Sequence, residues 1–215
     1  KRKARRRYAK YFHGLGRGSY DWENIIPVNK SPHLMNKLGY VGALFPKGTL
    51  ILIVRDIYSH SASMKYHFEK LHKADGRTYF MEDSPQACYS QTHGDVPEGK
   101  PSFPSDFSII PELWIRMNTL AFKELNDATF QQKIVVSYED MVTNQKGTLT
   151  AIFEALKLKQ SHRAVSREIA EKATVLVNTT TKGNPLEKWK DQLSSEEVES
   201  IDSALSKHAE DYAFI

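Results

Sequence analysis

Cysteine is nearly absent from this sequence: Cys88 is the single one among 215 residues. The chain therefore cannot form an internal disulfide, and it lacks the cysteine-rich pattern of structural zinc sites. Its eight histidines show no metal-ligand spacing, so we expect no metal. A lone cysteine is compatible with a reducing compartment but does not establish one.

Long hydrophobic runs are also missing. No apolar stretch approaches the roughly 20 residues that a membrane-spanning helix needs, and no signal-peptide core is present. The chain begins with Lys rather than Met, so we expect that a segment lies upstream of it. At 40% hydrophobic and 26% charged residues, the composition is that of an ordinary globular domain.

Acidic residues are absent from the first ten positions, KRKARRRYAK, which carry seven Lys or Arg. The rest of the chain has 23 basic and 26 acidic residues, so the net charge of +4 comes from this end. Such a run can contact nucleic acid or a membrane surface. We favour a solvated or frayed terminus, and we assign 1–12 to a basic segment and 13–215 to a single domain.

A glycine-rich phosphate loop is missing as well. Gly14, Gly16 and Gly18 have the spacing of part of a dinucleotide fingerprint. No apolar strand precedes them and no convincing helix follows, so we interpret this stretch as a flexible loop.

Three short apolar runs predict strands, at 25–28, 50–54 and 133–138. The run Leu50–Val54 is unbroken, which is typical of a strand covered on both faces in a parallel sheet. Apolar periodicity and caps predict helices at 33–45, 59–73, 109–126, 147–158 and 161–176, and a last helix opened by a capping box at Ser194 and Glu197.

This alternation predicts a three-layer α/β/α domain with a parallel sheet. Three strands are few for so many helices, so we expect at least one more. Residues 74–106 contain many Pro, Gly and polar residues with no sustained period, and we interpret them as a long loop insertion.

Polar side chains follow each predicted strand: Lys30 and His33, then Arg55 and Ser63, then Tyr138. A parallel sheet brings the carboxyl ends of its strands to one edge, where open α/β sheets bind ligands. Basic, hydroxyl and aromatic groups at that edge favour an anion that carries a ring, such as a nucleotide.

Four segments together resemble the sulfotransferases that use 3′-phosphoadenosine 5′-phosphosulfate (PAPS). VRDIYSHSAS resembles that family's 3′-phosphate motif, with Ser63 eight residues after Arg55. NKSPHL resembles the strand-end lysine motif, in a form closer to the tyrosylprotein and carbohydrate branches. The other two segments are VSYEDMVTNQKGTLTAIFEALKL and KGNPLEKWKDQLSSEEVESID.

The resemblance implies the sulfotransferase fold, which is P-loop nucleotide-kinase-like, and PAPS as co-substrate without a metal. It places Arg55 and Ser63 on the 3′-phosphate and Tyr138 by the adenine. The resemblance also implies that Lys182 and Gly183 form a second contact to the 3′-phosphate.

For the transfer step, the resemblance implies that Lys30 stabilises the sulfuryl group or the leaving phosphate oxygen. His33 is the candidate base, although the small-phenol branch has its histidine one residue nearer to the lysine. The acceptor is a hydroxyl or amine of a carbohydrate, peptide or small molecule.

The sequence departs from the family in one respect. The family has a glycine-rich phosphosulfate loop before the strand-end lysine motif, and this sequence has none before Lys30. We therefore expect a chain incomplete at its N-terminus and lacking the first strand. A catalytically incomplete nucleotide-binding or interaction domain of the same fold is the alternative, and a nucleic-acid binder is less favoured. An upstream signal anchor would place the protein in the Golgi lumen rather than the cytoplasm.

Each candidate also has a purely structural interpretation. Arg55 can pair with Asp56 or another acid, and Ser63 can be a helix-surface serine. His33 can be an ordinary first-turn residue, and Tyr138 can belong to the core. We expect Trp114 and Trp189 to be packing residues.

Overall fold

A computed structural model of the chain describes residues 28–84, 87, 89–157, 168 and 184–210. The chain divides into two compact units, 1–32 and 33–215. Of the first unit only residues 28–32 are described, so the fold below is that of the second. Among the described residues, no helix has the length and hydropathy needed to cross a bilayer.

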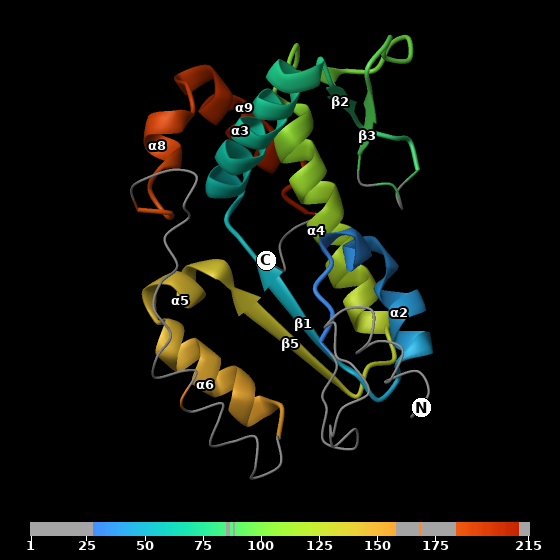
Figure 1. Cartoon of the computed structure of the whole chain (residues 1–215), viewed down its shortest axis with the longest axis vertical. Coiled ribbons are helices and arrows are strands. Elements are labelled where there is room, and N and C mark those ends of the chain that lie inside the picture. Colours follow the sequence, from blue (N-terminus) through green and yellow to red (C-terminus); the bar gives the residue numbers. More distant parts are fainter. Residues whose placement is uncertain (1–27, 85–86, 88, 158–167, 169–183, 211–215) are drawn as a thin grey trace, which may run out of the picture. The chain divides into compact units, whose positions relative to one another are not determined.

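The described elements follow one another in the order drawn in Figure 1. They are η1 (Pro32–Lys37), α2 (Leu38–Leu44), β1 (Thr49–Val54), α3 (Ile57–Asp75), β2 (Thr78–Phe80), β3 (Ser90–Thr92), β4 (Ser102–Phe103), α4 (Ile109–Asp127), β5 (Gln132–Ser137), α5 (Tyr138–Thr143), α6 (Gln145–Ala155), α8 (Trp189–Gln192) and α9 (Ser195–Lys207).

A two-stranded parallel sheet is the centre of this unit. Strand β1 pairs with β5 in a register that runs from Thr49 opposite Gln132 to Val54 opposite Ser137. Both strands therefore end at the same edge, where α3 and α5 begin. The mixed α/β class and the parallel sheet predicted from the sequence are confirmed.

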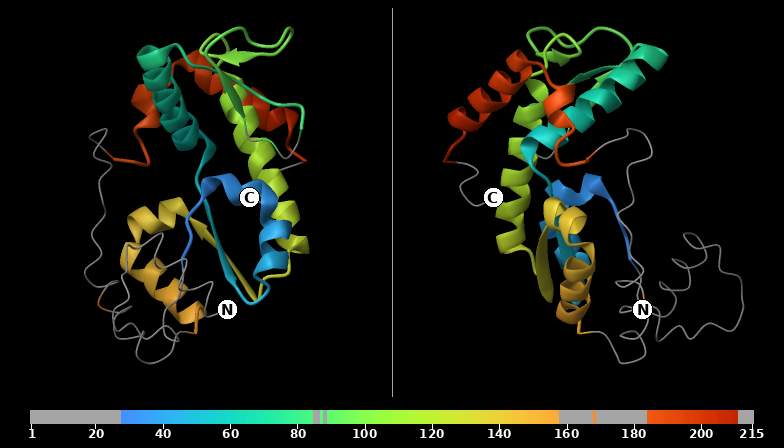
Figure 2. Two further views of the ribbon diagram at one scale, coloured as in Figure 1. Left: turned by 45° about the vertical axis from the view of Figure 1, so that its right-hand side comes forward. Right: turned by 90° about the vertical axis from the view of Figure 1, so that its left-hand side faces the viewer.

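Helices lie on both sides of this sheet (Figure 2). Leu52 is buried and packs with Leu38 of α2 and with Ala121 and Leu125 of α4. Val136 of β5 points to the other face, because paired neighbours share a face and successive side chains alternate. It is also buried, and α6 contacts β5.

The prediction that β1 is covered on both faces is wrong. Ile51 is 38% exposed and Ile53 is 53% exposed. Their face of β1 is opposite the one that packs on α2 and α4. Continuous apolar character thus marks a strand that could be covered on both sides, but the described helices cover only one side of it.

The helix predicted at 59–73 is confirmed as α3, which begins two residues earlier. The Asp56 carboxylate caps it by accepting the backbone N–H of Ser59 at 2.9 Å. The helix ends at Gly76, which has a left-handed φ of +72° that glycine adopts without steric cost.

The prediction of a long irregular loop at 74–106 is wrong in part. This segment forms a three-stranded antiparallel sheet in the order β3-β2-β4. Phe68 of α3 stacks on Tyr79 of β2, with ring centroids 3.8 Å apart, and also contacts Tyr89 and Phe103. The segment is therefore attached to α3 by an aromatic core of its own.

Most of the remaining predicted elements are confirmed with shifted ends. The 33–45 helix is divided into the 3-10 helix η1 and α2, and the 109–126 helix is α4. The predicted 133–138 strand ends at Ser137, because Ser137 caps α5 and Tyr138 is already helical. The capping box of the last helix is present.

Some predictions fall outside the described residues. The strand at 25–28 is described only at Val28, which lies in no strand. The helix at 161–176 is described only at Glu168.

Candidate functional site

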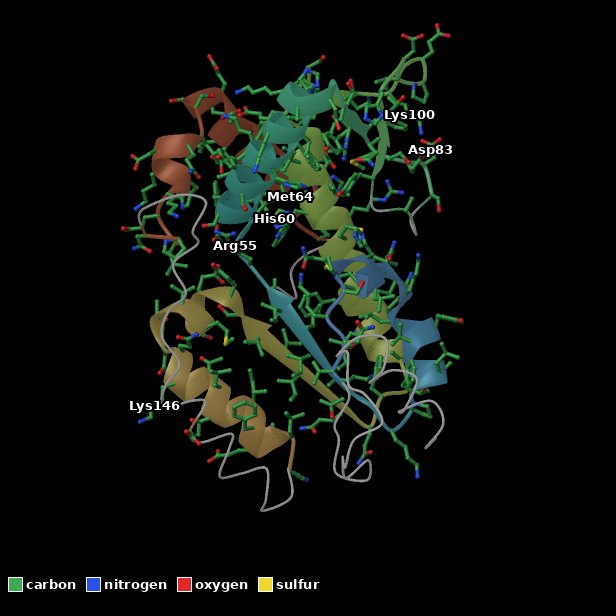
Figure 3. The ribbon with its side chains drawn as sticks, viewed as in Figure 1. Arg55, His60, Met64, Asp83, Lys100 and Lys146 are labelled. Carbon is green, nitrogen blue, oxygen red and sulfur yellow. The ribbon has the colours of Figure 1, made fainter. Side chains whose placement is uncertain are left out.

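A pocket of about 400 Å³ lies where β1 ends and α3 begins. That volume is within the range of small-molecule sites. Figure 3 labels Arg55 at the end of β1, with His60 and Met64 further along α3. The described residues that line the pocket are Arg55, Ser59, Ser63, Met64, Tyr66, His67, Lys70, Tyr138, Pro185, Lys188, Trp189 and Gln192.

Arg55 is fixed in the pocket by contacts from three directions. Its backbone carbonyl accepts the indole N–H of Trp114 at 3.0 Å. Its Nη2 donates to the carbonyl of Pro185 at 3.1 Å, and its guanidinium carbon lies 4.6 Å from the centroid of the Tyr138 ring. These contacts orient the guanidinium without neutralising its charge.

The ion pair considered for Arg55 is not present among the described residues. Asp56 instead caps α3, and no described carboxylate lies within ion-pair distance of the Arg55 guanidinium. The Nε of Arg55 is shielded from solvent and has no hydrogen-bond partner within the described ranges. A shielded donor of this kind is costly to leave unpaired. The guanidinium as a whole has no acidic partner among the described residues, so its charge is available to an anion that enters the pocket.

Glu139 joins the ends of the two parallel strands. Its carboxylate accepts the backbone N–H of Asp56 at 3.1 Å and the hydroxyl of Ser137 at 2.9 Å. The residue before Asp56 is Arg55, and the residue after Ser137 is Tyr138. Glu139 therefore helps to keep Arg55 and Tyr138 next to each other at the ends of the two strands.

Ser63 lines the same pocket as Arg55. It lies one helical turn after Ser59 on α3, on the face that Ser59, Tyr66, His67 and Lys70 share. The spacing of eight residues therefore brings a strand-end guanidinium and a helix hydroxyl to one cavity.

The opposite wall comes from the segment that leads into α9. Lys65 attaches it to α3 by donating to the carbonyl of Gln192 at 3.2 Å and to the Glu197 carboxylate at 2.7 Å. The Trp189 ring lies tilted against that of Tyr58, with ring centroids 4.8 Å apart, and lines the pocket as well. Trp189 is thus a packing residue that also lines the pocket.

The pocket is cationic. Arg55, Lys70 and Lys188 line it, and none of the described lining residues is acidic. Two serines and the aromatic rings of Tyr66, Tyr138 and Trp189 also line it. Such a site can bind a phosphate or sulfate through charge-assisted hydrogen bonds and a planar ring by stacking.

The structure brings three of the seven predicted site residues together in one pocket. Arg55, Ser63 and Tyr138 line one pocket. His33 is exposed in η1 and does not line it, and Lys30 is exposed and belongs to the other unit. Lys182 and Gly183 lie outside the described residues.

Sequence reasoning missed three cationic or potentially cationic residues of the pocket, His67, Lys70 and Lys188. The first two could have been found, because they follow Ser63 by four and seven residues and so share its helix face. Lys188 could not, because only the tertiary fold brings it to α3.

His60 lies in the first turns of α3, and its pKa is lowered from 6.5 to about 4. The largest cause is burial, which disfavours the imidazolium, and the Arg55 charge acts in the same direction. The nearby Asp56 carboxylate opposes both but does not outweigh them. The folded chain therefore holds His60 neutral at mildly acidic pH.

This lowered pKa predicts an acid-sensitive fold. Below pH 6.5 the unfolded chain protonates His60 while the folded chain does not, so the free energy of unfolding falls as pH decreases towards about 4. The loss is up to about 3 kcal/mol. Urea unfolding of His60→Gln between pH 7 and 4.5 should show a shallower pH dependence than that of the parent chain.

His33→Gln is the matched control, because His33 is an exposed histidine. It should retain the parent pH dependence. Identical pH profiles for His60→Gln and the parent chain would contradict the assignment.

Among the described residues, no group of three or more His, Cys, Asp or Glu is placed to hold a metal ion. Comparison of the chain with protein-family models, with curated proteins and with solved structures finds no match in any of the three.

Proposed function

We propose that this chain is a PAPS-dependent sulfotransferase, which transfers a sulfuryl group from the nucleotide to a hydroxyl or amine acceptor. The observation that carries the proposal is the shared pocket of Arg55, Ser63 and Tyr138. The sequence resemblance assigned Arg55 and Ser63 to the 3′-phosphate and Tyr138 to the adenine, so their shared pocket supports the proposal.

The charge and shape of the pocket support a nucleotide as the ligand. The Arg55 guanidinium has no carboxylate partner among the described residues, so a phosphate oxygen can accept a charge-assisted hydrogen bond from it. Ser63 adds a hydroxyl donor, and Tyr138 and Trp189 offer ring faces to a base. An acidic ligand without a ring would leave the aromatic lining unused.

The sulfotransferase form of the P-loop nucleotide-kinase-like fold is part of this proposal. A parallel strand pair whose carboxyl ends meet at the pocket is consistent with it.

In the proposed reaction, an acceptor oxygen or nitrogen attacks sulfur in line, the S–O bond to the 5′-phosphate breaks, and adenosine 3′,5′-bisphosphate leaves. Lys30 stabilises the charge that develops on the leaving oxygen, and His33 takes the acceptor proton. Both roles remain predictions from the sequence resemblance.

A second candidate is a nucleotide-binding domain without transferase activity. It is favoured by the position of His33, which is exposed and does not line the pocket. A nucleic-acid binder acting through residues 1–10 is less favoured.

A transfer assay separates these candidates. The chain, and a version extended upstream, would be incubated with radiolabelled PAPS and a phenol, a tyrosine-containing peptide or a polysaccharide. Labelled acceptor is expected with the extended chain. Binding of adenosine 3′,5′-bisphosphate without transfer to any acceptor would overturn the enzyme proposal in favour of the second candidate. Salt-sensitive binding to duplex DNA or RNA that is lost when residues 1–10 are deleted would favour the nucleic-acid binder.

A further inference from the structure

One wall of the pocket is the segment 184–192, which we call the C-terminal wall. It supplies Trp189 and Gln192 to the lining. The segment consists of turns followed by α8, a helix of only four residues that lies beside α3 (Figure 1). A helix this short is not stable by itself, so the position of the wall depends on its contacts with the rest of the fold.

The two ends of the C-terminal wall are attached in different ways. At its start, the Pro185 carbonyl accepts a hydrogen bond from Arg55, which lines the pocket. At its end, the Gln192 carbonyl accepts a hydrogen bond from the ammonium group of Lys65 at 3.2 Å. Lys65 does not line the pocket. It therefore acts on the wall rather than on a ligand inside the pocket.

The same ammonium group also holds the first turn of α9. Lys65 pairs with the Glu197 carboxylate at 2.7 Å, and the same carboxylate oxygen accepts the backbone N–H of Ser194 in the capping box at 2.8 Å. The side chains of Lys65 and Glu197 are 21% and 17% exposed, so salt screens their pairing less than it screens a surface pair. Lys65 thus joins α3 to the end of the wall and to the helix that follows it.

Apolar packing places the ring of the wall next to this polar contact. Ala62 lies three residues before Lys65 and so shares its helix face. It belongs to a buried cluster with Leu193 and Ile201, and Trp189 packs against that cluster. Because Trp189 also lines the pocket, a shift of the wall along α3 would move the Trp189 ring relative to the ligand.

We propose that Lys65 is a positioning residue of the nucleotide site, which holds the Trp189 ring where the base of the ligand packs against it. This inference rests on the proposed nucleotide site and adds to it a residue that contacts no ligand atom. Lys65 acts through the ring, so it sets the affinity for the adenosine part of the ligand, whereas Arg55 sets the affinity for the 3′-phosphate.

The test is a calorimetric comparison of adenosine 3′,5′-bisphosphate and adenosine 5′-monophosphate, which share the adenosine part. Lys65→Met keeps most of the apolar stem and removes the ammonium group. It should weaken binding of both nucleotides by a similar factor of about 3- to 10-fold, because the ring contact is loosened for both. Lys65→Arg should restore most of the affinity, because a guanidinium can donate to a carbonyl and a carboxylate at once.

Glu197→Gln tests the same link from the other side. An amide oxygen can still accept the Ser194 N–H, so α9 keeps its capping box while the charge pair with Lys65 is lost. Both affinities should fall less than in Lys65→Met, because the hydrogen bond from Lys65 to Gln192 remains. The double variant should bind no more weakly than Lys65→Met, since the loss of the ammonium group already breaks the pair.

Lys207→Met is the matched control. Lys207 is the last residue of α9, and it pairs with Glu112 of α4 at 2.7 Å, the same distance as in the Lys65 pair. Neither Lys207 nor Glu112 lines the pocket. The variant removes the same charge and also an ion pair of α9, and it should leave both affinities unchanged.

Three results would overturn the positioning role. Lys65→Met could bind both nucleotides as the parent does, could weaken the bisphosphate alone as a lost charge would, or could match Lys207→Met. If bisphosphate binding still depends on Arg55 in these cases, the proposed nucleotide site stands without the positioning residue. If the parent chain binds neither nucleotide, both proposals fail.

Discussion

Replacing Arg55 by Ala is expected to weaken binding of adenosine 3′,5′-bisphosphate about 100-fold. The guanidinium is oriented by Pro185 and Tyr138 and has no carboxylate partner among the described residues, so it can donate to a phosphate. Hydrogen bonds to charged groups contribute about 1.5–3 kcal/mol each, and a bidentate contact makes two. Titration calorimetry at fixed ionic strength measures the change.

Two further variants make this prediction specific. Arg55→Lys keeps the charge but loses the planar guanidinium, so it should recover only part of the affinity. Arg116→Ala removes an arginine that donates to backbone carbonyls of Glu82 and Asp83, outside the pocket, and should bind as the parent does. Equal affinities for Arg55→Ala and Arg116→Ala would remove the basis of the nucleotide site.

The second large effect is expected from Phe68→Ala, which should lower the free energy of unfolding by about 3–5 kcal/mol. Phe68 is 1% exposed and contacts the rings of Tyr79 in β2, Phe103 in β4 and Tyr89, which directly precedes β3. Its removal leaves a cavity between α3 and that sheet. Guanidinium unfolding followed by far-UV circular dichroism measures the loss.

Tyr66→Ala is the control for this variant. Tyr66 is an aromatic residue of the same helix but is 43% exposed, so its replacement should cost less than about 1 kcal/mol. Similar losses for the two variants would mean that residues 74–106 do not form a packed layer on α3.

The strand-end part of the site was predictable from local sequence. An apolar run followed by Arg55 and a helix carrying Ser63 fixes both residues to one strand–helix junction, because strand and helix geometry leave little freedom over eight residues. The capping box at Ser194 and Glu197 was predictable for the same reason, since all its contacts span three residues.

Other features depend on contacts between distant segments, and local patterns do not encode them. The β3-β2-β4 sheet has strands of only two or three residues, too short to show an alternating pattern. Its stability comes from Phe68, which lies outside the segment. The segment that carries Lys188 is held against α3 by a hydrogen bond from Lys65 to the backbone carbonyl of Gln192. These two residues are 127 positions apart in the sequence.

The exposure of Ile53 shows a further limit of predicting burial from an apolar run. Composition indicates that a strand is apolar enough to be covered on both faces, but not which neighbour covers it. Here α2 and α4 cover the Leu52 face, while Ile53 on the other face is 53% exposed among the described elements.

The central claim is that the pocket recognises a nucleotide by its 3′-phosphate through Arg55. Its most direct test is the ratio of affinities for adenosine 3′,5′-bisphosphate and adenosine 5′-monophosphate, measured on the parent chain and on Arg55→Ala. The parent chain should prefer the bisphosphate at least about 30-fold, and Arg55→Ala should lose most of this preference. Equal affinities of the parent for the two nucleotides, or a preference that survives in Arg55→Ala, would contradict it.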